Sequence, residues 1–424
     1  MIYIKRLFPL ARVQGVKYFA LFLWVLALTL QVNAQNNTNS PYTRLGYGRL
    51  EDPGFSTTQS MGGVAYGLRS RISMNPANPA SNSSVDSTSF LFEFGVSGLY
   101  SNFSSGANSV NTFTSNVDYL AFQFPLTKWM GMSVGLIPYS FVGYKYNTSD
   151  SIAPTLTQAQ SFYGTGGISQ AYVGIAATAW KRLSLGVNMY YMYGSMNHVR
   201  TMSAISSSIT TYTTTQTSDL YVKNLNFRYG LQYQETFGRH SFCIGLVYDH
   251  LSKLNGDFTQ ITTGVVNDTI SSDSLKFDIP SLYGGGLTYT YDNRLTVGAD
   301  YTFQEFSKAR YYGKTDTLTN RYKISLGGEY IHKPNGNKYV DRMRWRLGAN
   351  YSNSYTTFNT IGTRTIAVTC GVGFPLRTTK TMVNVNFEYG NIGAQQKALL
   401  SENYLKIGIN LTLNEVWFFK QRIQ

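Results

Sequence analysis

The sequence predicts an all-β protein, a 14-stranded antiparallel transmembrane β-barrel with an N-terminal hatch (plug) segment. Three observations favour this fold class. The chain begins like an exported protein, its later segments alternate apolar and polar residues, and the connections between them alternate between short and long. After residue 34, no apolar run approaches the ~20 residues that a transmembrane helix needs.

Residues 1–34 are predicted to be a cleaved signal peptide. A basic start precedes the apolar core YFALFLWVLALTL at residues 18–30, and Val32-Asn33-Ala34 forms a small-residue cleavage site. This leader carries four basic residues and no acidic one, so the rest of the chain keeps +10 of the net charge of +14. With no cysteine directly after Ala34, a lipid anchor is not expected, and Cys243 and Cys370 alone make no disulfide framework.

The composition narrows the class of exported protein. Aromatic residues make up 15% of the chain and charged residues only 14%, which is typical of a barrel that faces lipid. Composition alone leaves a secreted soluble β-protein open.

The period of the pattern indicates strands. In YLKIGINLTL (residues 404–413) every second residue is Leu or Ile, and the residues between them are mostly small or polar. A strict period of two over ten residues predicts a strand with one apolar and one polar face. The same pattern places fourteen strands near residues 89–102, 118–128, 131–144, 168–180, 183–196, 220–237, 241–250, 279–292, 294–308, 321–332, 342–355, 364–376, 381–391 and 403–413.

The connections support a membrane barrel. Short turns mostly follow even strands, whereas long Ser/Thr/Asn-rich connections such as 145–167, 197–219 and 251–278 follow odd ones. Trp129, Trp180 and Trp345 stand beside short turns, where an interfacial aromatic girdle would lie. A soluble β-sandwich is the alternative, but it has no need of small polar residues on one face of every strand.

Residues 35–88, ahead of the first strand, are predicted to form a hatch inside the barrel. Fourteen strands fall between barrels that fill their own lumen and those that leave an aqueous channel. The segment lacks clear periodicity, yet it is too rich in apolar residues for a disordered tail. The sequence therefore divides into a signal peptide at 1–34, a hatch at 35–88 and a barrel at 89–424.

The segment before the first strand also carries a resemblance. Its SPYTRLGYGRL, SMGG, LRSR and NPANPASN stretches, followed by SFLFEFG, resemble the FadL/OmpP1/TodX family of outer-membrane transport proteins, in the branch typical of Bacteroidetes. The resemblance implies that an Asn-Pro-Ala motif lies in the hatch. The motif occurs twice, as Asn75-Pro76-Ala77 and Asn78-Pro79-Ala80, and either copy can be the family equivalent.

The same resemblance implies a lateral opening at a kink in the third strand. The third predicted strand contains Pro138, and proline removes a hydrogen bond from a strand ladder whatever the family. Pro138 is therefore a candidate gate residue. Its alternative is a place near an exposed loop end, beyond the membrane.

Arg342, Arg344 and Arg346 share one face of the eleventh predicted strand, opposite Met343, Trp345 and Leu347. If the apolar face contacts lipid, the arginines point into the lumen. Ion pairing is the favoured reading, with Glu51, Asp52, Glu329 and Glu388 as candidate partners. The functional alternative is a cationic site for an anionic headgroup, because guanidinium binds carboxylate in a bidentate manner.

Catalytic signals are weak. The four histidines lack metal-ligand spacing, no G-x-S-x-G motif occurs, and only Asp249-His250 suggests acid–base chemistry. We expect no enzyme, metal or cofactor, and nucleic acid is not a sensible partner for an exported barrel.

The predicted function is passive uptake of hydrophobic, fatty-acid-like small molecules across the outer membrane of a Gram-negative bacterium, by a hatch and lateral-opening mechanism. The expected partners are outer-membrane lipid and the ligand, with the barrel a monomer. The alternative is a non-transporting barrel, a partner or shuttle in protein secretion or outer-membrane assembly, as the shuttle barrel of type IX secretion is in this branch. Under it, the long connections are docking surfaces for protein partners.

Overall fold

The computed structural model describes residues 38–416 apart from 107, 154–155, 207–211, 265–266, 273–275, 316, 359–360, 377–379 and 395–399. The chain divides into two compact units, Met1–Gln35 and Asn36–Gln424. The predicted signal peptide, residues 1–34, lies outside the described residues, all of which belong to the second unit.

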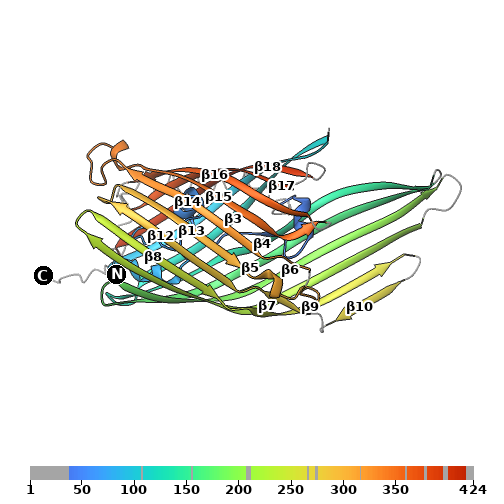
Figure 1. The fold of residues 1–424 in the computed structure, drawn as a ribbon, viewed down its shortest axis with the longest axis horizontal. Coiled ribbons are helices and arrows are strands. Elements are labelled where there is room, and N and C mark those ends of the chain that lie inside the picture. The colour runs from blue at the N-terminus through green and yellow to red at the C-terminus, as the bar shows by residue number, and fades with distance from the viewer. Residues whose placement is uncertain are drawn as a thin grey trace, which may run out of the picture. The chain divides into compact units, whose positions relative to one another are not determined.

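Fourteen antiparallel wall strands close into a barrel, because the last pairs with the first along its whole length (Figure 1). Two wall strands are interrupted: β8 and β9 form one, and β10, β11 and β12 form the next. The wall elements are β2 (Ser89–Ser105), β3 (Asn108–Pro125), β4 (Met130–Ala153), β5 (Leu156–Ala179), β6 (Leu183–Ser206), β7 (Tyr212–Phe237), β8 (His240–Asp249), β9 (Ser252–Thr263), β10 (Asp268–Ser272), β11 (Phe277–Ile279), β12 (Leu282–Tyr291), β13 (Leu295–Gln304), β14 (Arg321–Ile331), β15 (Arg344–Phe358), β16 (Ile361–Pro375), β17 (Met382–Ala394) and β18 (Ser401–Val416).

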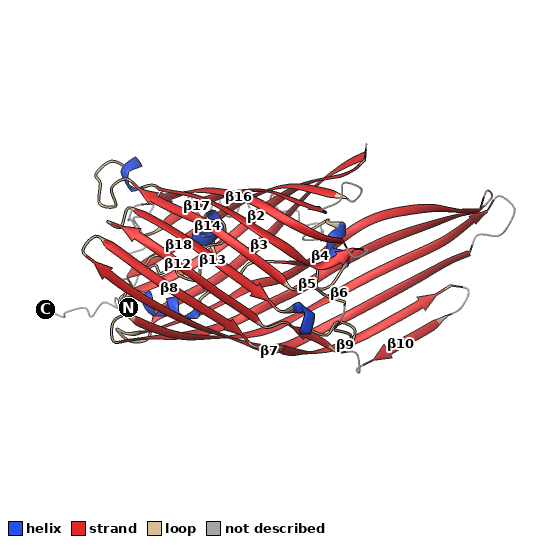
Figure 2. Ribbon diagram, viewed as in Figure 1, coloured by secondary structure: helices blue, strands red, loops and turns tan. Residues whose placement is uncertain are grey.

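Helices are short and few among the described residues (Figure 2). None of them is long and apolar enough to cross a membrane. Ahead of the wall, the N-terminal segment (residues 38–88) holds η1 (Pro41–Arg44), the two-residue strand β1 (Arg49–Leu50), α2 (Ser56–Ser60) and η2 (Pro79–Ser84); η3 (Phe306–Lys308) and η4 (Val340–Arg342) lie in connections.

The prediction of fourteen antiparallel strands is confirmed, but the predicted long connections are wrong in part. Most of 145–167 and 197–219 is strand, since β4, β5 and β6 each run for 24 residues and β7 for 26, and most of 251–278 belongs to β9, β10 and β11. These segments are rich in Ser, Thr and Asn, and some of their apolar side chains point inward, so the contrast that reveals a strand in sequence is weak. They form the long hairpins at one end of the barrel, the hairpin end, opposite the short-turn end (Figure 1).

Burial along the wall is inverted relative to a soluble protein. On β8 the exposed side chains are Phe242, Ile244, Leu246 and Tyr248, whereas polar wall residues on the other face are buried. Buried polar side chains recur around the lumen at Asn188, Arg228, Gln232, Asp300, Asn384 and Asn410. An apolar outer face around a polar interior is what a bilayer-spanning barrel requires.

Aromatic side chains mark the short-turn end. Trp129, Trp180 and Trp345 are all exposed, Trp180 the most, at 85% of its surface. Trp180 and Trp129 stand at the turns that join β5 to β6 and β3 to β4. This is the position of an interfacial aromatic girdle.

Candidate functional site

The N-terminal segment lies inside the barrel wall and bonds to widely separated strands. The Ser40 hydroxyl donates to Glu402 on β18 at 2.5 Å, and the Tyr47 hydroxyl donates to the carbonyl of Asp278 on β11 at 3.0 Å. Farther along, the Gly62 N–H donates to the Thr369 hydroxyl of β16 at 2.8 Å. The segment is therefore anchored on several sides of the lumen.

Apolar side chains of the segment are buried against the wall. Phe55 stacks on Tyr119 of β3 with ring centroids 3.9 Å apart, and Met61 and Val64 are fully buried. Packing of this kind explains why the apolar residues of the segment do not belong to a disordered tail.

Glycines on the inward face of the wall let the segment approach closely. A Cβ on Gly245 of β8 would lie 1.8 Å from the Tyr66 carbonyl oxygen, and one on Gly348 of β15 would lie 2.2 Å from the Gly62 nitrogen. A Cβ on Gly186 of β6 would meet the Pro79 carbonyl carbon at 2.5 Å. Sequence reasoning missed these residues, although glycine at inward positions of a strand is a signal that another backbone comes close.

The asparagine side chain of the first Asn-Pro-Ala copy forms hydrogen bonds within the N-terminal segment. The Asn75 amide donates to the carbonyls of Ala65 and Leu68 at 2.6 and 3.0 Å, and the Pro76 carbonyl accepts from Asn188 of β6 at 3.0 Å. Proline supplies no N–H at this point, so the asparagine side chain takes over the turn's hydrogen bonds.

The second copy joins the segment to the wall. The Asn78 amide donates to the Tyr66 carbonyl at 2.8 Å and to the Leu231 carbonyl of β7 at 3.2 Å. Its side-chain oxygen accepts from the Ala80 N–H at 3.1 Å and so caps η2, in which Pro79 is the first residue. Ala77 and Ala80 are buried beside these bonds. The two asparagine side chains thus make different contacts, because that of Asn75 bonds within the segment whereas that of Asn78 also reaches the wall.

The pairing of β4 with both of its neighbouring strands changes close to Pro138. Pairing between β3 and β4 runs from Pro125↔Gly131 only to Leu120↔Leu136, although both strands continue. On the other side of β4 the register with β5 shifts at Pro138, which marks a bulge. Among the described residues, β3 and β4 are therefore not paired with each other beyond Leu136, on the side of the hairpin end.

The N-terminal segment covers the edge of β4 that β3 leaves. Strand β1 pairs with β4 through Arg49↔Phe141 and Leu50↔Ser140, and the Glu51 N–H donates to the Tyr139 carbonyl at 3.0 Å. Just beyond, a Cβ on Gly48 would lie 2.3 Å from the Phe141 carbonyl oxygen, with φ at +83°, so glycine alone fits there. The segment thus supplies β4 with a substitute neighbour.

The three arginines of the predicted cationic site have different surroundings. Arg344 and Arg346 both contact Glu329 of β14, at 2.6 and 2.7 Å, and Arg346 also donates to Asn384 at 2.8 Å. Arg342 lies in η4, at the short-turn end, with its guanidinium 6.0 Å from the Tyr339 ring centroid. Of the candidate ion-pair partners, Glu329 is the one that the structure places against Arg344 and Arg346.

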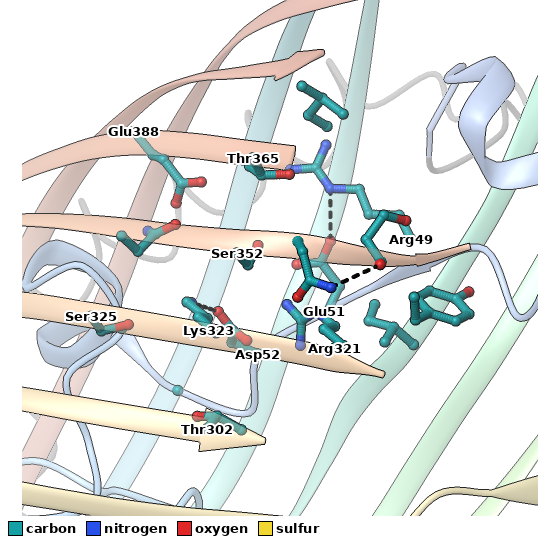
Figure 3. Close-up of a pocket in the computed structure, with 18 of the residues that line it drawn as sticks. Arg49, Glu51, Asp52, Thr302, Arg321, Lys323, Ser325, Ser352, Thr365 and Glu388 are labelled. Atoms are coloured by element: carbon teal, nitrogen blue, oxygen red, sulfur yellow. Dashed lines mark hydrogen bonds and ion pairs between the residues drawn. The ribbon is translucent and has the colours of Figure 1, made fainter. Parts of the chain in front are cut away.

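A polar pocket of about 190 Å³ lies between the segment and β13–β18 (Figure 3). Arg49 and Glu51 of the segment face each other across 3.7 Å, and Asp52 pairs with Lys323 of β14. Glu51 also contacts Lys406 of β18 at 3.5 Å. Figure 3 shows Ser325, Ser352, Thr302, Thr365, Arg321 and Glu388 around the same space.

The charges of this pocket are balanced within the protein. Desolvation in the lumen alone would raise the pKa of Asp52, but the charges of Lys323 and Arg321 outweigh it and hold the pKa below its ordinary value. Leaving a buried polar group without a partner costs about 1–3 kcal/mol on the protein mutational scale. A hydrocarbon in this pocket would displace water from many such groups, so the pocket is ill suited to an apolar ligand.

The Asp249-His250 pair does not form a catalytic arrangement. Asp249 faces inward and receives two 2.7 Å bonds from Arg228, whereas His250 is exposed and contacts the Tyr248 hydroxyl. Neighbours in a strand point to opposite faces, which explains the separation. Within the described part of the chain, no three His, Cys, Asp or Glu side chains are grouped to hold a metal ion.

Solved structures share the barrel fold. The chain is similar to a Pseudomonas aeruginosa FadL homologue, with 11% identity, a TM-score of 0.55 and coverage of 87% of this chain and 99% of that one. It is also similar to the Pseudomonas putida toluene transporter TodX (15%, 0.57, 87% and 100%) and to the Ralstonia pickettii toluene transporter TbuX (15%, 0.56, 85% and 98%). At such identities the likeness shows the barrel fold alone.

Sequence comparison gives the family. No curated protein matches the chain. The model of one family, BamG, matches residues 16–424, which is nearly the whole sequence. The chain therefore belongs to the BamG family.

Proposed function

We propose that this chain is an outer-membrane barrel whose lumen stays closed and which acts as a partner or shuttle in protein secretion or outer-membrane assembly. One observation carries this proposal. The N-terminal segment is held inside the wall by ion pairs with Lys323 and Lys406, by hydrogen bonds that join both Asn-Pro-Ala copies to wall strands, and by the pairing of β1 with β4.

The chemistry of the lumen supports closure over conduction. Moving the segment would break the contacts of Lys323 with Asp52 and of Lys406 with Glu51. The four charged side chains would then lie in the lumen without their ion-pair partners. Each of these pairs is partly exposed and contributes up to about 1 kcal/mol, so the segment is held by several contacts acting together. A channel for an apolar ligand gains nothing from such contacts along its path.

The experiment that tests this proposal is purification of the full chain from its own organism in mild detergent, followed by native mass spectrometry. We expect a complex with a stoichiometric protein partner and no small-molecule mass retained in the barrel. A monomeric barrel that carries a fatty acid or an aromatic hydrocarbon, without a protein partner, would contradict the proposal.

Passive uptake of hydrophobic molecules remains the second candidate, because of the seam between β3 and β4. Their pairing stops at Leu136 next to the bulge at Pro138, and a lateral exit for a ligand needs such a gap. Two proteins of similar structure, TodX and TbuX, are toluene transporters. In this case the segment is a hatch, Pro138 is the gate, and Arg342, Arg344 and Arg346 meet an anionic headgroup.

Uptake of a radiolabelled hydrocarbon or fatty acid by cells with and without the chain separates the candidates. Uptake that depends on the chain would favour the transporter. Under the proposal of a closed partner barrel, uptake is equal in both strains.

A further inference from the structure

A second cavity, of about 290 Å³, lies at the hairpin end and is distinct from the polar pocket between β13–β18 and the segment. Its wall comes from β4 to β7, from the connection that follows β13, and from the start of the N-terminal segment. The residues that matter here are Arg44, Tyr144, Phe162, His198, Arg200 and Tyr311.

Two guanidinium groups converge in this cavity. The Arg44 Cζ lies 3.9 Å from the ring centroid of Phe162, and the Arg200 Cζ lies 5.6 Å from the same centroid. Arg44 donates to the Tyr146 hydroxyl and Arg200 to the Gln160 side chain, both at 2.9 Å. One aromatic ring therefore holds two positive charges in place.

Neither arginine is neutralised. Among the described residues no ion pair includes Arg44 or Arg200, and the buried Arg200 Nε has no hydrogen-bond partner. The phenols of Tyr311 and Tyr312 stay neutral, because burial raises the pKa of both. A guanidinium with a free, desolvated N–H is a site for an anion.

The remaining lining mixes polar side chains with the apolar Leu45, Val199 and Leu318, a combination that suits a peptide. Gln216, Ser218, Thr317, Thr356 and Thr357 present hydroxyl and amide groups beside the aromatic rings. A hydrocarbon chain would leave these groups without partners, at about 1–3 kcal/mol each. A peptide can offer them carbonyl and N–H groups.

A strand edge leads to the cavity. Among the described strands, none pairs with the outer edge of β4 between Tyr144 and Asp150, because β3 leaves β4 at Leu136 and β1 covers only Ser140 and Phe141. An extended segment from another protein can add to such an edge through main-chain hydrogen bonds, with alternate side chains in a neighbouring pocket.

We propose that this cavity binds an acidic side chain on an extended segment of the partner protein, with Arg44 and Arg200 as the anion-binding groups. The inference rests on the proposed function as a partner barrel and names the chemistry of the contact. The carboxylate binds between the two guanidinium groups, and the segment's backbone runs along the edge of β4.

The test uses the full chain in its own organism, with a photo-crosslinking benzophenone amino acid in place of Thr357. We expect a protein crosslink whose mapped peptide has an Asp or Glu within a few residues of the attachment point. The Arg44→Gln/Arg200→Gln double variant should lower the crosslink yield about tenfold or more. Arg239→Gln, an exposed change of the same kind in the turn between β7 and β8, away from the cavity and from the edge of β4, is the matched control and should leave the yield unchanged.

Heat-modifiable gel migration shows that each variant is folded. A second measurement titrates the purified chain with a synthetic copy of the crosslinked peptide, with the same peptide carrying Asn or Gln for its acids, and with dodecanoate. Tighter binding of the acidic peptide, lost in the double variant, supports the inference. A crosslink to lipid, preferential binding of dodecanoate, or a yield indifferent to both arginines overturns it.

These outcomes also separate the inference from the proposed function. If a stoichiometric partner co-purifies but the crosslink does not depend on Arg44 and Arg200, the partner role stands and the anion site falls. If no protein partner co-purifies, both the partner role and the anion site are wrong.

Discussion

Positive charges have different partners in the lumen around Asp52 and Asp249, here called the lower lumen, and in the cavity at the hairpin end. In the lower lumen Arg228 meets Asp249 in a bidentate pair, and Lys323 meets Asp52. At the hairpin end Arg44 and Arg200 both lie against the Phe162 ring, and neither has a carboxylate partner among the described residues. The pairs of Arg228 and Lys323 fit a lumen that stays closed, and the missing carboxylate at Arg44 and Arg200 fits a site for a ligand, as we propose.

The difference extends to the backbone. The lower lumen is sealed by glycine-lined approaches, such as that of Tyr66 to Gly245, in which no space for a side chain remains. The hairpin end has strands that run past their neighbours, with an edge of β4 left unpaired by any described strand. Under the proposed function, the closed lower lumen stabilises the folded barrel and the open hairpin end contacts the partner protein.

The largest effect should come from breaking the buried ion pair of the lower lumen. Asp249→Ala leaves the Arg228 guanidinium buried without a counter-charge, which should lower the free energy of unfolding by about 3–5 kcal/mol. The urea midpoint of unfolding, followed by heat-modifiable gel migration, measures it.

The same measurement on the cavity at the hairpin end sharpens the contrast. Arg200→Gln removes a cation with no ion pair to lose, so we expect a change of less than about 1 kcal/mol. The double variant Arg228→Met/Asp249→Leu should recover most of the loss of Asp249→Ala. Equal destabilisation by Asp249→Ala and Arg200→Gln would contradict the proposed difference between the two regions.

A slightly smaller effect should come from filling a glycine approach. Gly245→Ala places a methyl group on the Tyr66 carbonyl, and the segment must move, at a cost of about 1–3 kcal/mol. Limited proteolysis of the folded barrel should then cut the segment faster. Gly362→Ala, where a Cβ meets nothing within 4 Å, is the matched control, and equal cleavage of both variants would count against a tightly held segment.

The two Asn-Pro-Ala copies offer a comparison within the segment. Asn78→Ala removes the bond to the Leu231 carbonyl and should loosen the segment from the wall, whereas Asn75→Ala removes only internal bonds. Each should cost about 1–3 kcal/mol. Hydrogen exchange at residues 60–80 should rise in both variants, and exchange at β7 should rise in Asn78→Ala only.

The smallest effect should be that of Pro138→Ala. The change gives β4 one more N–H, but β1 already covers the edge beyond it, so stability should shift by less than about 1 kcal/mol. The uptake of a labelled hydrocarbon should be unchanged. Reduced uptake would instead assign Pro138 to a gate and favour the transporter.

The wall could be predicted from sequence because lipid imposes a strict contrast on each strand. Leu405, Ile407 and Ile409 alternate with smaller or polar residues, and the strand they indicate is β18. The extensions of β4 to β7 and the strands β9 to β11 could not be predicted, since they are rich in Ser, Thr and Asn and bury apolar side chains such as Tyr144 and Phe162 on the inward face, so the usual contrast is lost. The predicted connections 145–167, 197–219 and 251–278 were wrong in part for this reason.

The site was less accessible to sequence reasoning. Parity placed Arg344 and Arg346 on one face, but their shared partner Glu329 comes from the neighbouring strand and was one of four candidates. The Arg44–Phe162–Arg200 group joins the segment to two strands, over more than 150 positions of chain. No local pattern marks such a group.

The central claim, a lumen that stays closed, is tested most directly by locking β1 to β4. Leu50 and Ser140 are directly opposed in an antiparallel pair, so Leu50→Cys/Ser140→Cys brings two cysteines within reach of a disulfide, in a chain with Cys243→Ser and Cys370→Ser. We expect the oxidised variant to bind its protein partner and support growth as well as the reduced one and the single-cysteine controls. Loss of either on oxidation, restored by a reductant, would show that the segment must move and would contradict the account.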